Sequence, residues 1–204
     1  LCSWHSKTLE PIPGVAESWT ISDDKLTYTF HLRKNAVWSD GSSITAEDFH
    51  YSFRRFLHPG TGAEYAYELW YVEGAEAYTA QTVEAGDRVE IELHERPEGA
   101  LPHARGKMLH GVLRAIESGT SDSPTYMVEI DGEVQRFQKD GEDGGRSYQW
   151  LLPDFETTVA IKVLDPYTLE MKLRDPTPYF LTLMGFYPLF PVNQRCVETY
   201  GYPL

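Results

Sequence analysis

The side chains of this 204-residue sequence that could bind a metal or act in catalysis are seven histidines, two cysteines and 31 acidic residues. The histidines are His5, His31, His50, His58, His94, His103 and His110. None of them forms an HxxxH pair or an HExxH motif, the spacings that place two ligands on one helix face. GxSxG, P-loop and GxGxxG patterns are also absent. Without a nucleophile–base or metal constellation, we expect no enzyme, no cofactor and no metal site.

Two further groups leave alternatives open. Cys2 and Cys196 lie near opposite ends of the sequence. They could form a disulfide that closes a long loop in an oxidising compartment, or they could be two isolated buried thiols. The acidic residues Asp122, Glu142 and Asp143 could bind Ca²⁺, but the EF-hand spacing is absent. We interpret that region as a solvated acidic loop.

Composition excludes several classes of protein. The formal charge of −13 makes nucleic acid a poor partner, because binding depends on cationic neutralisation of phosphates. The mean hydropathy is −0.42, and no apolar run of ~18 residues exists, so we expect no direct membrane insertion. A hydrophobic content of 41% is enough for one large domain or two small ones. The sequence does not begin with Met, and we expect an excised piece with its targeting segment upstream.

The elements that must position any site are clearest between residues 19 and 56. A strand is predicted over 26–33, where apolar Leu26, Tyr28, Phe30 and Leu32 alternate with polar residues. Trp38-Ser39-Asp40-Gly41 predicts a turn. Thr45 is then a predicted helix N-cap, and Asp48, three residues later, is its predicted capping partner. The helix over 46–57 should bury Phe49, Phe53 and Phe56.

Apolar patterns predict the remaining elements of the flanking parts. Residues 1–18 should be extended and irregular, residues 63–78 a helix broken at Gly74, and residues 159–163 and 169–173 a hairpin. Short helices are predicted over 179–184 and from Asn193 to Tyr200. The strands at 26–33, 159–163 and 169–173 should share one antiparallel sheet, with the helices 46–57 and 63–78 packed on it. The predicted fold class is therefore α+β.

The middle of the sequence, residues 81–156, has a different character. It contains 16 acidic and 8 basic residues and so contributes −8 to the total charge. Short alternating runs at 88–93, 125–130, 134–137 and 148–152, with Asp131-Gly132 as a hairpin turn, predict an all-β segment. We predict an inserted small barrel of the SH3-like kind. Its core should contain Val89, Ile91, Leu113, Tyr126, Val128, Ile130, Val134 and Phe137.

Two blocks of sequence resemble a known family. The first contains PGVAESW at 13–19, YTFHLR at 28–33, WSDG at 38–41 and TAEDF at 45–49. The second runs from DPYTLE at 165–170 to PTPYF at 176–180. Together they cover a little over half of the chain. They resemble the family 5 extracellular solute-binding proteins of bacterial ABC importers, which bind oligopeptides, dipeptides and nickel.

The resemblance implies a domain organisation and a function. Residues 1–80 and 157–204 would form the smaller companion domain of a peptide-type solute-binding protein, with residues 81–156 inserted. The chain would be a fragment of a periplasmic or extracytoplasmic, membrane-associated component of an importer for oligopeptides or dipeptides. Its partners would be a peptide or other small solute in the full-length protein and the importer permease. Because the peptide sits chiefly between two large lobes that are absent here, we expect weak binding by the chain alone.

The resemblance also implies a role for Tyr65. In the family, the segment matching Pro59-x-Thr61-x-x-x-Tyr65-Ala66 directs its tyrosine toward the ligand cleft, although a packing role is an equal alternative. A second function for the chain remains open as well. The acidic inserted barrel could act as a protein-interaction module of the cell envelope.

Overall fold

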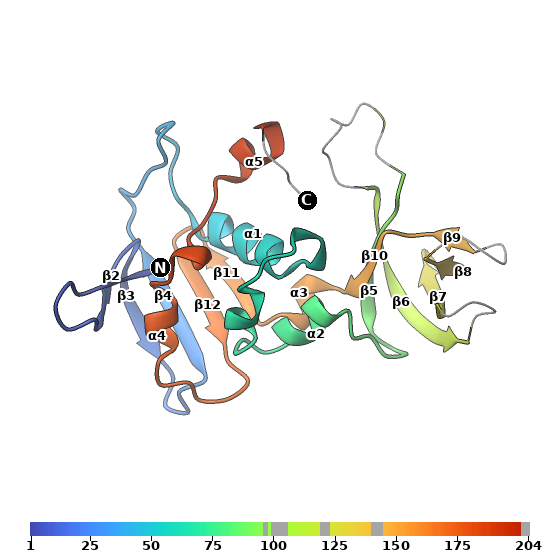
Figure 1. Ribbon diagram of the computed structural model, residues 1–204, viewed down its shortest axis with the longest axis horizontal. Helices are drawn as coiled ribbons and strands as arrows, with labels where there is room; N and C mark the ends of the chain where they lie inside the picture. Colours follow the sequence, from blue (N-terminus) through green and yellow to red (C-terminus); the bar gives the residue numbers. More distant parts are fainter. Residues whose placement is uncertain (96–97, 99–105, 119–122, 140–144, 201–204) are drawn as a thin grey trace. The chain divides into compact units, whose positions relative to one another are not determined.

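The chain forms two units in the computed structural model, which describes residues 1–95, 98, 106–118, 123–139 and 145–200. The first unit contains Leu1–Glu76 and the described part of Val159–Gly201. The second unit contains the described part of Ala77–Thr158. Helices and antiparallel strands occur in both, so the mixed α+β class is confirmed (Figure 1).

A four-stranded antiparallel sheet organises the first unit, in the order β11-β12-β4-β3. The strands are β3 (Ala16–Ile21), β4 (Thr27–Leu32), β11 (Ile161–Asp165) and β12 (Thr168–Lys172). In the register, Leu169 lies opposite Phe30 and Met171 lies opposite Tyr28. Directly opposite residues point to the same side of a sheet, so these buried side chains form one apolar face. The prediction that these three segments share one sheet is confirmed.

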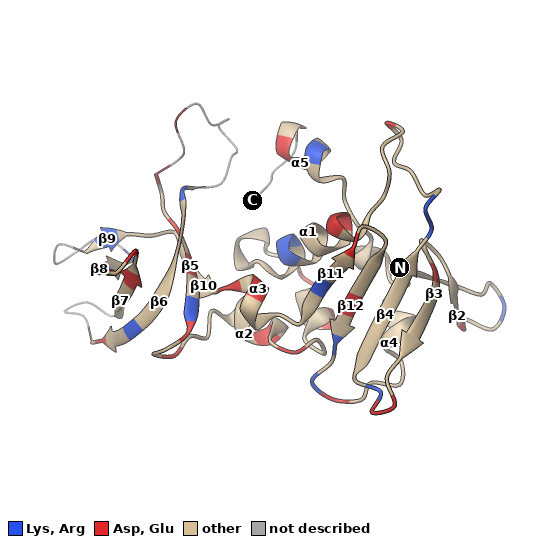
Figure 2. Cartoon of the chain, turned by 180° about the vertical axis from the view of Figure 1, so that it is seen from behind, with Lys and Arg blue, Asp and Glu red and all other residues tan. Residues whose placement is uncertain are grey.

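The opposite face of this sheet is polar. Lys162 on β11 lies directly opposite Glu170 on β12, and Glu170 lies opposite Thr29 on β4. Figure 2 shows the basic position on β11 beside the acidic position on β12. Opposite charges at directly paired positions stabilise neighbouring strands modestly. Helices therefore cover one side of this sheet, and polar residues occupy the other.

Helix α1 (Ala46–Leu57) packs against β11 and β12 (Figure 1). At its start, the Thr45 backbone N–H donates to Asp48 Oδ2 over 2.8 Å, which confirms the predicted capping pair. Phe49 and Phe53 are buried as predicted. Phe56 is only half-buried, and Leu57 occupies the core instead. Leu57 lies four residues after Phe53 and so continues the apolar stripe on the buried face of the helix.

The predicted helix over 63–78 is wrong for residues 63–74, whereas the residues after the expected break at Gly74 are helical. The segment contains the 3₁₀ turns η1 (Pro59–Thr61) and η2 (Ala66–Leu69) and the short helix α2 (Ala75–Ala80), which crosses the junction between the units. Between η2 and α2 the backbone pairs with the end of β12. Val72 bridges Leu173, and the Glu73 N–H donates to the Lys172 carbonyl over 3.0 Å. Backbone groups used in this way cannot form helical hydrogen bonds.

The first eighteen residues are also more regular than expected. Strands β1 (Cys2–Trp4) and β2 (Pro11–Pro13) pair as a hairpin, and β3 forms the edge of the main sheet. Most side chains of β3 are exposed. An edge strand with little burial carries no strict apolar alternation, so its sequence does not indicate a strand.

The last part of the first unit contains α4 (Phe180–Leu183), the 3₁₀ turn η4 (Tyr187–Leu189) and α5 (Gln194–Tyr200). Asn193 Oδ1 accepts the Cys196 N–H over 2.9 Å, which confirms Asn193 as the cap of the last helix. Cys2 and Cys196 are both free thiols, so they form no disulfide. Cys2 is buried, and burial raises the pKa of its thiol to about 11. Cys196 is exposed, so the alternative of two buried thiols holds only for Cys2.

The second unit contains a six-stranded sheet in the order β10-β5-β6-β7-β8-β9. Its elements are β5 (Arg88–Glu92), β6 (Met108–Glu117), β7 (Thr125–Ile130), β8 (Glu133–Gln138), β9 (Arg146–Ser147), β10 (Trp150–Pro153) and the short helix α3 (Phe155–Thr158). The turn between β7 and β8 has positive φ at Asp131 (53°) and Gly132 (83°). Two successive positive φ values are typical of the hairpin turn that Asp-Gly predicts.

One face of this sheet forms a core of its own. The buried residues are Val89, Ile91, Leu93, Leu113, Val128, Ile130, Phe137, Tyr148 and Leu151, with Tyr126 packed against them. Val134 is 53% exposed, so its predicted place in the core is wrong. Tyr148, between β9 and β10, and Leu151 on β10 take part instead.

The alternating pattern of β5 predicts that its glutamates are exposed, and this is not what the structure shows. Glu90 and Glu92 alternate with apolar residues but are themselves buried. Glu90 Oε1 accepts a hydrogen bond from the Tyr78 hydroxyl over 2.6 Å, and Glu92 Oε1 accepts the Gly106 N–H over 2.9 Å. These partners compensate part of the cost of burying two carboxylates. The acidic residues Asp122, Glu142 and Asp143 lie outside the described residues.

Candidate functional site

Tyr65 lies immediately before η2 in the first unit and is 38% exposed. Its ring packs edge-on against Phe186, with the ring centroids 5.4 Å apart and an interplanar angle of 87°. The Tyr67 ring is also near, with a centroid distance of 6.2 Å. The fold therefore brings the segment around η2 against the segment between α4 and η4.

Further aromatic residues extend this contact. Tyr71 and Tyr179 pack edge-on at 5.6 Å, and the Tyr179 hydroxyl donates to the Tyr71 hydroxyl over 2.9 Å. That hydrogen bond is the main reason why the pKa of Tyr71 is raised. Tyr187 packs against Phe186 at 5.1 Å and is 67% exposed. We call Tyr65, Tyr67, Tyr71, Tyr179, Phe186 and Tyr187 the aromatic cluster.

The aromatic cluster has the chemistry of a recognition surface. Tyrosine rings offer large, stiff apolar area together with a hydroxyl that can donate or accept a hydrogen bond. The Tyr65 hydroxyl makes no hydrogen bond within the part of the chain that the structure describes. It thus remains available to a ligand, while its ring is held by Phe186. The two roles considered for Tyr65, packing and binding, are compatible in this geometry.

Sequence reasoning identified one member of the cluster and missed its partners. Tyr179, Phe186 and Tyr187 lie more than 100 residues after Tyr65 in the sequence. The only local signal is the apolar, proline-interrupted run at 186–192, FYPLFPV. Such a run excludes a central strand but does not indicate which residues it contacts.

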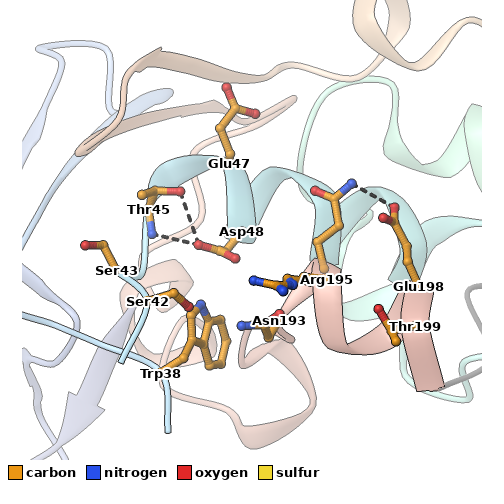
Figure 3. A pocket seen from close by; sticks show the side chains of 11 residues that line it. Trp38, Ser42, Ser43, Thr45, Glu47, Asp48, Asn193, Arg195, Glu198 and Thr199 are labelled. Atoms are coloured by element: carbon orange, nitrogen blue, oxygen red, sulfur yellow. Dashed lines mark hydrogen bonds between the residues drawn. The ribbon is translucent and has the colours of Figure 1, made fainter. Parts of the chain in front are cut away.

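A separate pocket of about 350 Å³ lies between the start of α1 and α5 (Figure 3). Its lining residues are Trp38, Ser42, Ser43, Thr45, Glu47, Asp48, Asn193, Gln194, Arg195, Glu198 and Thr199. The capping bond of Thr45 with Asp48 lies in one wall, and the first turn of α5 forms the other. The pocket combines residues from the WSDG turn, the α1 cap and the last helix of the described chain.

The described residues show neither a metal-binding group of side chains nor a membrane-spanning helix. In this part of the chain, no group of three or more His, Cys, Asp or Glu side chains is arranged to hold a metal ion. No helix within the same residues combines the length and hydropathy needed to cross a bilayer.

Comparison with known proteins gives a match over most of the chain. The model of the family described as bacterial extracellular solute-binding proteins, family 5 Middle, matches residues 10–201. The periplasmic oligopeptide-binding protein OppA of Escherichia coli (strain K12) is 45% identical over 191 residues. That alignment covers 94% of this chain and 22% of OppA.

Solved structures give the same result. The substrate-binding domain of an oligopeptide ABC transporter from Bacillus anthracis str. Ames matches with a TM-score of 0.59 and 28% identity over 98% of this chain. A periplasmic oligopeptide-binding protein of Borrelia burgdorferi, OppAIV, matches with a TM-score of 0.60 and 27% identity over 98% of this chain. The matches cover 25% and 26% of those two chains. This chain thus spans about a quarter or less of the length of the relatives.

Proposed function

Because this chain belongs to family 5 of the bacterial extracellular solute-binding proteins, we propose that it is part of the substrate-binding component of an ABC importer for oligopeptides or dipeptides. The family match over residues 10–201 carries this proposal. The names of the E. coli, B. anthracis and B. burgdorferi relatives support peptides as the class of solute. In this role the chain binds rather than converts its solute. It acts outside the cytoplasmic membrane and delivers the solute to the importer permease.

The two units suggest how the chain is built. We assign residues 1–80 and 157–204 to a companion domain of the solute-binding protein and residues 81–156 to an inserted small β-barrel of the SH3-like kind. The unit boundaries at Ala77 and Thr158 and the separate core of the second unit support an insertion. Within the first unit, the Ala160 N–H donates to the Glu73 carbonyl over 3.0 Å. The two ends of the host chain therefore lie side by side, as an inserted segment requires.

Tyr65 is the residue of this chain that we assign to ligand contact. The assignment is supported by the exposure of Tyr65, by its hydroxyl without a partner among the described residues, and by the packing of its ring against Phe186. A rigid aromatic side chain loses little conformational entropy when it meets a ligand. The other aromatic residues of the cluster would provide the surface around it.

The isolated 204-residue chain is expected to bind short peptides no more tightly than the millimolar range. Tight binding needs a concave site that buries most of the ligand, and the aromatic cluster is a surface in a chain about one quarter as long as its relatives. Calorimetry with a mixed library of di- to pentapeptides would test this. The longer protein that contains this sequence is the positive control and should bind members of the library in the micromolar range. Micromolar binding by the isolated chain would contradict the expectation that tight binding needs the rest of the longer protein. A longer protein that binds no peptide would refute the proposed solute.

Tyr65→Phe in the longer protein is expected to weaken peptide binding about threefold to tenfold, as the loss of one hydrogen bond implies. The ring and its contact with Phe186 are retained, so the thermal midpoint of the 204-residue chain should be almost unchanged. Tyr67→Phe is the matched control, because it removes a neighbouring hydroxyl from the same cluster and should leave the affinity within about twofold. An affinity that Tyr65→Phe leaves within about twofold would contradict a ligand contact by the Tyr65 hydroxyl.

A further inference from the structure

The pocket between α1 and α5 contains hydrogen-bond donors that the described chain does not use. The Trp38 Nε1–H is buried in its wall and has no hydrogen-bond partner there. Arg195 makes no hydrogen bond and no ion pair with any residue that the structure describes. Asn193 accepts the Cys196 N–H through Oδ1, which leaves the amide N–H groups of its side chain available. In Figure 3 the Arg195 guanidinium lies between Asp48 and Asn193, on the side of Trp38.

Buried donors in folded proteins are normally paired with an acceptor, so a buried donor without one within the chain can pair with a bound group. Here three donors line one pocket, and one of them carries a full positive charge. A planar guanidinium fork matches the two oxygens of a carboxylate. We propose that this pocket binds the carboxylate group of a small organic acid or of a peptide C-terminus.

The acidic residues around the pocket determine which anions fit. Asp48 Oδ2 is occupied by the Thr45 N–H and hydroxyl, at 2.8 and 3.1 Å. The Glu198 carboxylate accepts a hydrogen bond from Gln194 over 2.8 Å. Figure 3 shows the Glu47 carboxylate directed away from the Arg195 guanidinium. The negative charges of these three groups repel an anion in the pocket.

Asp40 adds a fourth negative charge close to the pocket. Its pKa is lowered mainly by the Ser42 hydroxyl, with a smaller contribution from Arg195. Asp40 therefore stays ionised at neutral pH, so the pocket and its immediate surroundings contain the cation Arg195 and four carboxylates. Because these surroundings are net negative, doubling the charge of the ligand doubles the net repulsion, so a monoanion that makes directed hydrogen bonds is tolerated better than a dianion. The proposal thus includes a preference for carboxylate over sulfate. A volume of about 350 Å³ is within the range of small-molecule sites.

The test uses the indole N–H resonance of Trp38 in the ¹⁵N-labelled 204-residue chain. Sodium acetate and sodium sulfate are titrated separately, with sodium chloride keeping the ionic strength constant. Acetate should shift this resonance in a saturable manner in the millimolar range, and sulfate should not. Trp38→Phe identifies the resonance. If that variant does not fold, the backbone amide signals of Asn193 and Arg195 serve as the readout.

Arg195→Gln should weaken acetate binding about tenfold, the loss expected for one charge-assisted hydrogen bond. Arg195 is exposed, so its replacement should not alter the thermal midpoint. Lys7→Gln is the control, because it makes the same change in net charge at an exposed position outside the pocket. A shift that is equal for acetate and sulfate, or that survives Arg195→Gln, would overturn the proposal.

A second titration separates the two sources of the carboxylate. The dipeptide Ala-Ala is compared with its C-terminal amide and with acetate. Binding of Ala-Ala at least as tight as that of acetate, with none by the amide, identifies a peptide C-terminus. Binding of acetate alone identifies a small organic acid. If neither acetate nor Ala-Ala shifts the signals, the proposal is wrong. This outcome is independent of the role of Tyr65, which is tested by peptide affinity of the longer protein.

Discussion

Phe30→Ala is expected to lower the free energy of unfolding of the first unit by about 3–5 kcal/mol, the usual cost of truncating a buried phenylalanine. Phe30 is fully buried in β4, with Leu169 of β12 on one side and Trp19 of β3 on the other. Three strands therefore lose contacts at once, and a cavity remains at the centre of the apolar face. Urea unfolding followed by far-ultraviolet circular dichroism would measure the change.

Phe190→Ala is the matched control for this substitution. Phe190 is 52% exposed, so the same change of residue type should alter the free energy of unfolding by less than about 0.5 kcal/mol. Similar losses for the two variants would mean that Phe30 is not in the core of this unit. A loss at Phe30 with an unchanged denaturant slope would support a cavity rather than a change in the unfolded state.

Replacing residues 81–156 by a short Gly/Ser linker is expected to leave a first unit that still unfolds cooperatively. The support for this is the separate core of the second unit and the bond between Ala160 and Glu73, which keeps the two cut ends together. Expressed alone, the excised segment should show dispersed amide signals. Loss of cooperative unfolding in the shortened host would contradict the insertion and assign these strands to the main sheet.

A second deletion tests at which residues the inserted segment begins and ends. Tyr78 is fully buried, and its hydroxyl donates to Glu90, while its ring packs edge-on against Phe155 at 5.0 Å. All three residues belong to the second unit. Deleting 81–156 leaves Tyr78 in the host without Glu90 and exposes a large aromatic side chain. Deleting 77–158 removes it, so we expect this host to be more soluble and at least as stable as the shorter deletion.

Local sequence determined the elements whose signals lie within a few residues. The alternation from Leu26 to Leu32 places one face of β4 in the core. Thr45 and Asp48 fix the start of α1, and Asp131-Gly132 fixes the turn between β7 and β8. These features depend on side-chain period and on local hydrogen bonds, which are properties of the sequence itself. The family resemblance was also present in local motifs, and the match over residues 10–201 confirms it.

Tertiary structure alone decided the features that depend on distant partners. The segment 63–78 has helical composition, yet Val72 and Glu73 pair with Leu173 and Lys172, about 100 residues later. Glu90 follows a surface pattern but is buried because Tyr78 supplies a donor. Phe186 reaches Tyr65 only after the chain has passed through the second unit. Such contacts are selected by the free energy of the whole packed chain, which local propensity does not encode.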